Sequence, residues 1–250
     1  MVTPLKKGSL FQMPCHHIHL KDITRGNRLL VLAPHPDDEA LGCGGGIAAA
    51  CAAGMNVDII CITDGSHSHK NSLHWPKDKL VTLRANEFFK STFILSNGLA
   101  RNFMLNYEDQ NSPNLISEIE LAAMHIKKRL APFYPTTIWS SWIGDPHIDH
   151  QNTAHLAYAL KRLFSDSVLF FYTVWGRFIE TDLLKEKKVL KLNTKPYQKI
   201  KEKAVMAHRS QMTRLIDDDP DGFVMSEQTR QHFISEDEYF LEADREYRAF

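Results

Sequence analysis

Two short segments of the sequence combine histidine with closely spaced carboxylates. The first is PHPDDE, in which His35 is followed by Asp37, Asp38 and Glu39, and the second is DPHIDH at residues 145–150. Two imidazoles and one carboxylate, with a coordination position left open, form the usual ligand set of a catalytic zinc. A closed structural site needs a fourth ligand, usually a thiolate, and the four cysteines form no CxxC pair. The two segments therefore predict a catalytic metal site, provided that the fold brings them together.

A competing interpretation is that the glycine-rich residues after the first segment bind a dinucleotide. Gly44, Gly46 and Ala49 match the spacing G-x-G-x-x-A, and Asp64 follows at the distance expected for a ribose-binding acid. However, the three consecutive acids at 37–39 would lie where the pyrophosphate should bind, and carboxylates repel an anion. We therefore expect a cation at this loop.

The surrounding pattern predicts the elements that position these residues. Short apolar segments at Arg28–Ala33 and Val57–Thr63 enclose a glycine- and alanine-rich helix that ends at Gly54, which is the pattern of a βαβ unit. Further helices are expected at about 79–95, 114–130 and 153–164, and further strands at about 136–142 and 168–175. The order predicts an α/β fold, a Rossmann-like, open, mostly parallel sheet with helices on both faces.

This fold predicts where the site lies. Ligands of open α/β sheets bind outside the carboxyl ends of the strands. The loops APHPDDEALG, TDGSHSHK and IGDPHIDH each follow an expected strand, so all three should open on one rim. We therefore expect the active site at the carboxyl ends of the strands.

Composition limits the remaining possibilities. The 250 residues are 43% hydrophobic and carry 30 basic and 30 acidic side chains, which predicts one domain spanning 1–250 and no nucleic acid as partner. No apolar segment is long enough to form a transmembrane span, and the start of the chain does not resemble a signal peptide. We therefore expect a cytoplasmic protein with reduced cysteines, which could form a homo-oligomer. The N-terminal segment 1–27 is expected to be peripheral, and 216–250 is an extension whose structure the pattern does not predict.

The two motifs carry a resemblance that covers most of the chain. APHPDDEALG followed by HIDH resembles the PIG-L/LmbE family of zinc-dependent deacetylases, which remove acetyl groups from N-acetylglucosamine-type sugars. TDGS, LRANE, FMLNYED and AHRSQM follow in the family order, from about residue 28 to 215. The resemblance implies a metal-dependent amidohydrolase that contains one Zn²⁺ per chain, with Fe²⁺ as a possible substitute. Its substrate would be a small N-acetylated sugar or glycoconjugate.

The resemblance also implies roles for individual residues. It implies three metal ligands, which are His35, Asp38 and His150. Asp37 would be the general base that activates water, and protonated His147 would stabilise the oxyanion, with Asp149 holding it charged and oriented. Either Asp37 or His147 would then protonate the leaving amine.

Two further residues are expected to bind the sugar. The resemblance points to Arg84 and Asp109, whose charged groups could bind vicinal hydroxyls. An alternative for Arg84 is a surface ion pair with Glu87, three residues further along the same expected helix. We also expect a conjugate to be a better substrate than the free sugar, because remote binding energy can position the scissile amide.

Two other classes of function remain open at this point. The same ligand types form the 2-His-1-carboxylate triad of iron(II) oxygenases, although these triads usually lie on all-β folds. A non-catalytic sugar- or nucleotide-binding protein could also use this fold. Acetate release, oxygen consumption and binding without turnover would distinguish the three classes.

Overall fold

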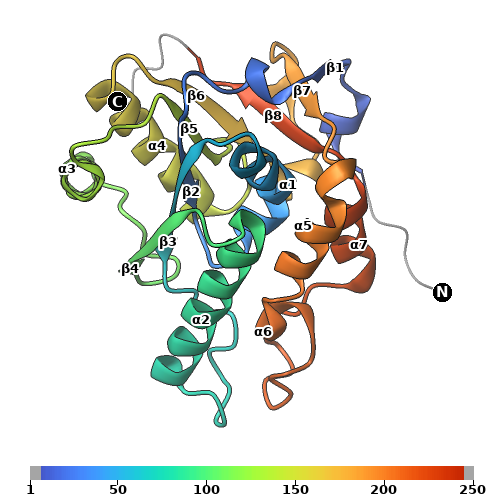
Figure 1. Ribbon diagram of the computed structural model, residues 1–250. Helices are drawn as coiled ribbons and strands as arrows, with labels where there is room; N and C mark the ends of the chain where they lie inside the picture. Colours follow the sequence, from blue (N-terminus) through green and yellow to red (C-terminus); the bar gives the residue numbers. More distant parts are fainter. Residues whose placement is uncertain (1–6, 245–250) are drawn as a thin grey trace.

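The centre of the protein is a single twisted sheet, shown in Figure 1. The computed structural model describes residues 7–244, so the first six and last six residues of the expected domain lie outside the described residues. Within that range the sheet contains eight strands: β1 (Cys15–Ile18), β2 (Arg28–Ala33), β3 (Asn56–Thr63), β4 (Arg101–Tyr107), β5 (Thr137–Ser141), β6 (Val168–Tyr172), β7 (Val189–Leu192) and β8 (Glu238–Glu242). Their spatial order is β1-β7-β8-β6-β5-β2-β3-β4. All neighbours are parallel except β8, which runs antiparallel to β6 and β7.

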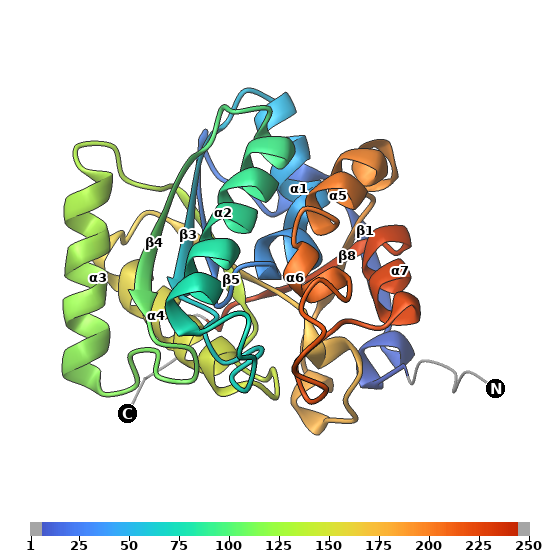
Figure 2. The same ribbon diagram turned by 90° about the horizontal axis from the view of Figure 1, so that it is seen from below.

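Helices cover both faces of the sheet, as Figure 2 shows from below. The α-helices of the described residues are α1 (Asp38–Ala52), α2 (Lys77–Ser96), α3 (Ile116–Leu130), α4 (Ile148–Leu163), α5 (Gln198–Val205), α6 (Arg209–Met212) and α7 (Glu227–Ser235). Buried side chains of α1, α2, α5 and α7 form one apolar core on one face, and those of α3 and α4 form a second core on the other. The expected open, mostly parallel α/β architecture is confirmed.

The central strands agree with the apolar segments of the sequence. β2 has the expected bounds, and β3, β5 and β6 begin or end within a few residues of them. Their near-continuous burial explains the agreement, because a parallel strand covered on both faces needs an uninterrupted apolar sequence. β4 was not expected, since its partly exposed sequence RNFMLNY gives a weaker pattern at the edge of the sheet.

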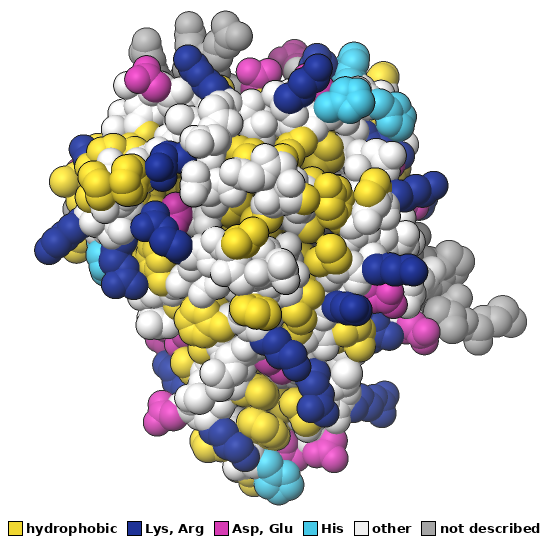
Figure 3. Space-filling model, viewed as in Figure 1, with side chains coloured by type: hydrophobic (Ala, Val, Ile, Leu, Met, Phe, Trp, Pro, Cys, Tyr) yellow, Lys and Arg dark blue, Asp and Glu magenta, His cyan; other side chains and the backbone are white. Residues whose placement is uncertain are grey.

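The two ends of the chain also contribute strands. β1, from the N-terminal segment, pairs with β7 at one edge, while β8, from the C-terminal extension, lies inside the sheet between β6 and β7. Within residues 7–244, no helix combines the length and hydropathy needed to cross a membrane. On the face shown in Figure 3, basic side chains are scattered among acidic, apolar and uncharged surface.

The glycine-rich segment forms a bent helix whose amides are already occupied. α1 includes the glycines and is interrupted at Cys43, whose φ of −144° is not helical. Just after this kink, the amides of Gly45 and Gly46 donate to the two oxygens of Glu238 at 2.7 and 2.8 Å. Lys201 Nζ lies 2.7 Å from the same carboxylate, and both charged side chains are buried. These amides are therefore unavailable to a pyrophosphate, which argues against the dinucleotide interpretation.

Candidate metal centre and substrate pocket

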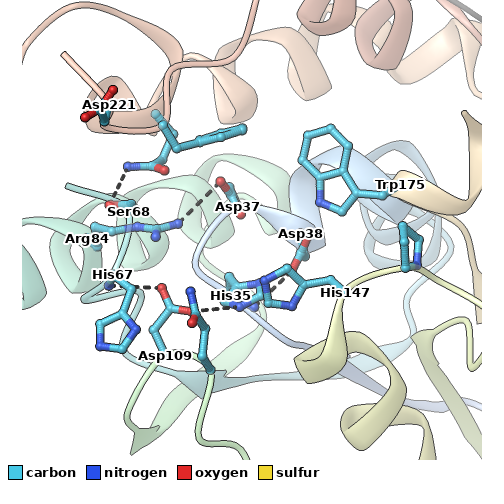
Figure 4. Close-up of a pocket in the computed structure, with 14 residues that line it drawn as sticks. His35, Asp37, Asp38, His67, Ser68, Arg84, Asp109, His147, Trp175 and Asp221 are labelled. Carbon is cyan, nitrogen blue, oxygen red and sulfur yellow. Dashed lines mark hydrogen bonds and ion pairs between the residues drawn. The ribbon is translucent and has the colours of Figure 1, made fainter. Parts of the chain in front are cut away.

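The loops at the carboxyl ends of the parallel strands enclose a pocket of about 520 Å³ (Figure 4). Its lining includes residues from the loops after β2, β3, β4, β5 and β6, together with residues that follow α6. The PHPDDE and DPHIDH segments therefore meet on one rim, as the predicted topology requires.

His35 and Asp38 line this pocket, and the fully buried His150 lies next to Asp38. Asp38 Oδ2 lies 3.1 Å from His35 Nδ1 and 3.1 Å from His150 Nε2. Ligands of a tetrahedral zinc lie about 2.0–2.2 Å from the ion, so neighbouring donors are about 3.3 Å apart. The two measured separations are compatible with this spacing.

The buried imidazole of His150 supports a cation at this position. Among the described residues, neither of its ring nitrogens has a hydrogen-bond partner of acceptable geometry, although Asp145 Oδ1 lies 3.3 Å from Nδ1. Burial lowers the pKa of His150, but the carboxylates of Asp145 and Asp38 outweigh this and raise it to about 10. The carboxylates thus favour a positive charge here, which a proton or a metal ion can provide.

Ring nitrogens of His35, His147 and His150 also lie within 4.8 Å of one another. A three-histidine donor set is therefore geometrically available, and donor atoms of His35, Asp109, His147 and Asp149 meet the same limit, whereas neither group includes Asp38. Figure 4 shows His35 and His147 side by side, next to Asp38. The residues present can therefore bind a metal ion, with more than one choice of donor atoms.

Asp37 faces the pocket from a strained position at the start of α1. It is the N-cap residue of this helix and has φ of 140°, a region that non-glycine residues rarely adopt. Its amide donates to Glu39 Oε2 at 3.1 Å, and Arg84 Nη2 lies 3.4 Å from its carboxylate. Burial raises the pKa of Asp37; Arg84 opposes that shift and Asp38 adds to it. A buried carboxyl with a raised pKa can accept and release a proton near neutral pH.

A buried network beneath Asp37 was not anticipated from the sequence. Glu39 Oε1 accepts a hydrogen bond from Ser91 Oγ at 2.7 Å and lies 3.0 Å from His208 Nε2. His208 belongs to the AHRSQM motif, whose Ser210 also binds Glu87 on α2 through its amide and hydroxyl. The motif therefore lies under the first turn of α1 and supports the backbone of Asp37 through Glu39.

His147 and Asp149 lie close together but have different partners. His147 is the N-cap of α4, and its Nδ1 accepts a hydrogen bond from the Asp149 amide at 3.2 Å. The Asp149 carboxylate lies 2.9 Å from His35 Nε2, whereas it is 4.0 Å from His147 Nδ1. Burial, followed by the charges of His35 and His150, lowers the pKa of His147. This geometry favours a neutral His147 that carries its proton on Nε2, and it places Asp149 against His35.

Arg84 and Asp109, the two expected sugar-binding residues, both line the pocket. Arg84 is only 3% exposed, and its guanidinium donates to the carbonyl oxygens of Gly65 and Pro36 at 3.0 and 2.7 Å. The alternative of a surface pair with Glu87 is wrong, because both side chains are buried and bind other partners. Asp109 Oδ1 lies 3.3 Å from His35 Nε2, and the His67 amide donates to its other oxygen at 3.1 Å.

Several lining residues had no signal in the sequence. They come from segments without a metal-like or catalytic motif and are Trp175, Asp221 and Phe223, whereas Gln211 belongs to AHRSQM but had no expected role. Asp145 was also missed, although it opens the DPHIDH motif. It is fully buried, and besides its contact with His150 it accepts a hydrogen bond from the Gly176 amide at 2.9 Å.

The protein thus has an open α/β sheet with a cluster of histidines and carboxylates at the carboxyl ends of its strands, where a metal ion can bind. The family model described as "PIG-L: GlcNAc-PI de-N-acetylase" matches residues 30–161, and the chain belongs to this family. The matched range includes both motif segments, Arg84 and Asp109. No curated protein matches the chain significantly.

Solved structures share the fold at low sequence identity. The N,N'-diacetylchitobiose deacetylase from Pyrococcus horikoshii is 22% identical with a TM-score of 0.59, and the match covers 73% of this chain and 70% of that one. Teicoplanin deacetylase, in a zinc-inhibited form, is 17% identical with a TM-score of 0.65 over 87% of this chain and 99% of that one. The 4-carboxy-2-hydroxymuconate hydratase from Pseudomonas putida is 16% identical with a TM-score of 0.58, over 73% and 78%. These likenesses establish the fold alone, and the hydratase shows that the fold does not fix the reaction.

Proposed function

We propose that this protein is a metal-dependent hydrolase that removes the acetyl group from an N-acetylglucosamine-type sugar or glycoconjugate. The observation that carries the proposal is the convergence of Asp38 on His35 and His150, 3.1 Å from each, with Asp37 beside it in the same pocket. Membership of the GlcNAc-PI de-N-acetylase family supports the reaction class.

His35, Asp38 and His150 are the proposed metal ligands, and zinc is the proposed ion. The far nitrogen of each histidine faces a second carboxylate, because His35 Nε2 lies 2.9 Å from Asp149 and His150 Nδ1 lies 3.3 Å from Asp145. Metal-binding histidines usually donate their other N–H to such a group. This pairing favours the set with Asp38 over the three-histidine set. A zinc ion held there would polarise the acetamide carbonyl and lower the pKa of a water molecule. Fe²⁺ is the alternative ion.

Asp37 is the proposed general base and acid. Its carboxylate takes a proton from the attacking water and then delivers this proton to the nitrogen of the leaving amine. A raised pKa suits both steps, because such a group accepts a proton readily and still releases it. The neutral state that the geometry favours for His147 assigns the amine proton to Asp37.

His147 is the proposed donor to the oxygen of the scissile carbonyl. With Nδ1 accepting from the Asp149 amide, its Nε2–H remains available to stabilise the negative charge that develops on this oxygen. Asp149 contributes indirectly, since it positions His35 and also binds the loop after β4 through the Gln110 amide at 2.8 Å.

Arg84 and Asp109 are proposed to define the sugar end of the pocket. Arg84 lines the cavity and joins the Asp37 loop, through Pro36, to the loop after β3, through Gly65, so its contribution includes the position of Asp37. Asp109 is the better candidate for binding a hydroxyl, because its carboxylate lies at the wall beside His35.

The four free thiols are compatible with the expected reducing, cytoplasmic compartment.

The test measures acetate release together with metal content. The purified protein is stripped with a chelator, reloaded with Zn²⁺ or Fe²⁺, and incubated with N-acetylglucosamine and its conjugates. We expect acetate only from metal-loaded protein and no oxygen consumption. Oxygen uptake with Fe²⁺ would favour the iron oxygenase class, and saturable sugar binding without acetate would favour a binding protein.

A further inference from the structure

The pocket is built from two parts of the chain. The metal end, with His35, Asp38 and His147, comes from loops within residues 30–161, the range that the family model matches. The opposite wall comes from Trp175 and from residues 211–223, which lie beyond that range. The second wall is therefore built by residues that the family model does not describe.

This second wall is aromatic. The ring of Trp175 lies 5.9 Å from that of Phe223 and 6.2 Å from that of Phe233, with edge-to-face angles of 83° and 90°. Phe223 is 38% exposed, and Figure 4 shows the Trp175 indole across the pocket from Asp109 and His67. Aromatic rings that flank a polar pocket can pack on the C–H face of a sugar ring, while polar groups nearby bind its hydroxyls.

Both rings are held in fixed positions relative to the metal end. The amide after Trp175, that of Gly176, donates to Asp145 Oδ2, and the other oxygen of Asp145 lies 3.3 Å from His150. Phe223 is tied to the loop after β3, because its amide donates to the Ser68 carbonyl at 2.7 Å. The aromatic wall is therefore preorganised, which lowers the entropic cost of binding a ligand there.

The charges of the pocket exclude one class of ligand. Among the described lining residues, Arg84 is the only arginine or lysine, and its guanidinium already binds Gly65, Pro36 and Asp37. Asp221, two residues before Phe223, adds a carboxylate to the lining. A phosphate there would meet a negative side chain and no free cationic one, so a neutral group is favoured.

We propose that Trp175 and Phe223 form a second subsite that binds a neutral sugar ring linked to the acetamido sugar. Neutral oligosaccharides are then preferred over both the free monosaccharide and phosphate-linked conjugates. This inference rests on the proposed function, since the acetamide at the metal end places the linked ring against the aromatic wall.

The first test compares three substrates of the zinc-loaded enzyme, which are N-acetylglucosamine, N,N'-diacetylchitobiose and N-acetylglucosamine 1-phosphate. Covering several C–H groups of the second ring should raise kcat/KM for the disaccharide about tenfold or more above that of the monosaccharide. The phosphate should fall below both. Equal values for mono- and disaccharide, or a preference for the phosphate, would overturn the proposal.

The second test assigns the preference to the two rings. Trp175→Ala and Phe223→Leu should each lower the disaccharide-to-monosaccharide ratio of kcat/KM several-fold, because the linked ring loses its stacking surface. Phe93→Ala is the matched control, since this aromatic residue on α2 is 61% exposed and does not line the pocket. It should keep the wild-type ratio. Retention of the full ratio in both pocket variants would contradict the assignment.

Binding separates failure of the subsite from failure of the proposed function. If no substrate yields acetate, the proposed function fails, and titration calorimetry with chitobiose still tests the subsite on the wild-type protein. Binding that Trp175→Ala weakens about tenfold and Phe93→Ala leaves unchanged would support the subsite. No binding to the wild type, or equal binding to all three proteins, would overturn it.

Discussion

Asp37 and Asp38 are adjacent in the sequence, yet the start of α1 directs their carboxylates to different partners. Asp38 is the first residue of the helix and lies against His35 and His150, while Asp37, with its positive φ, lies against Arg84 at the pocket wall. The backbone strain at Asp37 separates the two functions. Asparagine is a suitable replacement at both positions, because it matches the shape of aspartate and tolerates positive φ better than most residues.

The neighbouring aspartates should therefore respond differently to the same substitution. Asp38→Asn should lose most of its bound zinc and, with it, its activity. Asp37→Asn should keep one zinc per chain and lose turnover on the order of 10²-fold or more, which added zinc does not restore. Elemental analysis and acetate release on each variant measure both effects. A zinc-free Asp37→Asn beside a zinc-loaded Asp38→Asn would reverse the assignment.

His147 distinguishes the proposed donor set with Asp38 from the three-histidine set. If the ion is bound by His35, Asp38 and His150, His147→Gln should retain zinc and lower kcat more than it raises KM, because its Nε2–H acts on the developing oxyanion. His150→Gln is the comparison and should lose the metal. Loss of zinc from His147→Gln to the same extent would instead favour the three-histidine set.

For individual residues, the sequence predicted which ones form the site better than it predicted their contacts. The spacing in PHPDDE and DPHIDH was sufficient to predict a shared site at the rim. The partner of Asp149 could not be predicted, because it depends on where the loop after β4 approaches the start of α4. Trp175 carried no signal because it was expected at the end of the strand at 168–175, which stops at Tyr172, and Phe223 because an isolated aromatic residue resembles any core residue.

Among the elements, α1 depends on a strand that is distant in the sequence. Just after its kink at Cys43, the amides of Gly45 and Gly46 donate to the carboxylate of Glu238 on β8. A carboxylate at the start of a helical segment is favoured by the helix dipole as well as by these bonds. The sequence could not reveal this contact, because a single glutamate in a short apolar strand has no distinguishing spacing.

Removing the charge of Glu238 should destabilise the protein strongly. Glu238→Gln leaves Lys201 buried without its counter-ion, and breaking a buried pair costs about 3–5 kcal/mol. Lys201→Gln should cost less, since Glu238 keeps its two amide donors. Urea unfolding measures both, with Asp182→Asn, from the exposed pair with Lys185, as a control that should behave like the wild type. Equal losses in the two buried variants would show that the amides of α1 add little.

Over the whole molecule, the N-terminal segment packs against the C-terminal elements α7 and β8. Phe11 packs edge-to-face on His232 of α7 and on Tyr239 of β8. Phe178 also packs edge-to-face on His232, and on the adjacent Phe233. Together with the insertion of β8 between β6 and β7, these contacts support our proposal that the chain folds as a single domain. Hydrophobic periodicity did not predict this closure, because it depends on pairing between strands far apart in the sequence.

His232, at this junction, should make the stability of the whole molecule sensitive to mild acid. Burial, assisted by the positive charges of Arg177, Lys7 and Lys201, lowers its pKa to about 3. In the unfolded chain a histidine takes up a proton below about pH 6.5, whereas the folded protein resists it until about pH 3. The unfolded state therefore binds more protons in this interval, so the free energy of unfolding falls as the pH is lowered. His232→Phe, which keeps an aromatic ring among the same neighbours, should reduce this loss between pH 6.5 and 5 in urea unfolding curves. Identical slopes for the wild type and the variant would mean that His232 is protonated in the folded protein and that the aromatic junction opens more readily than its packing indicates.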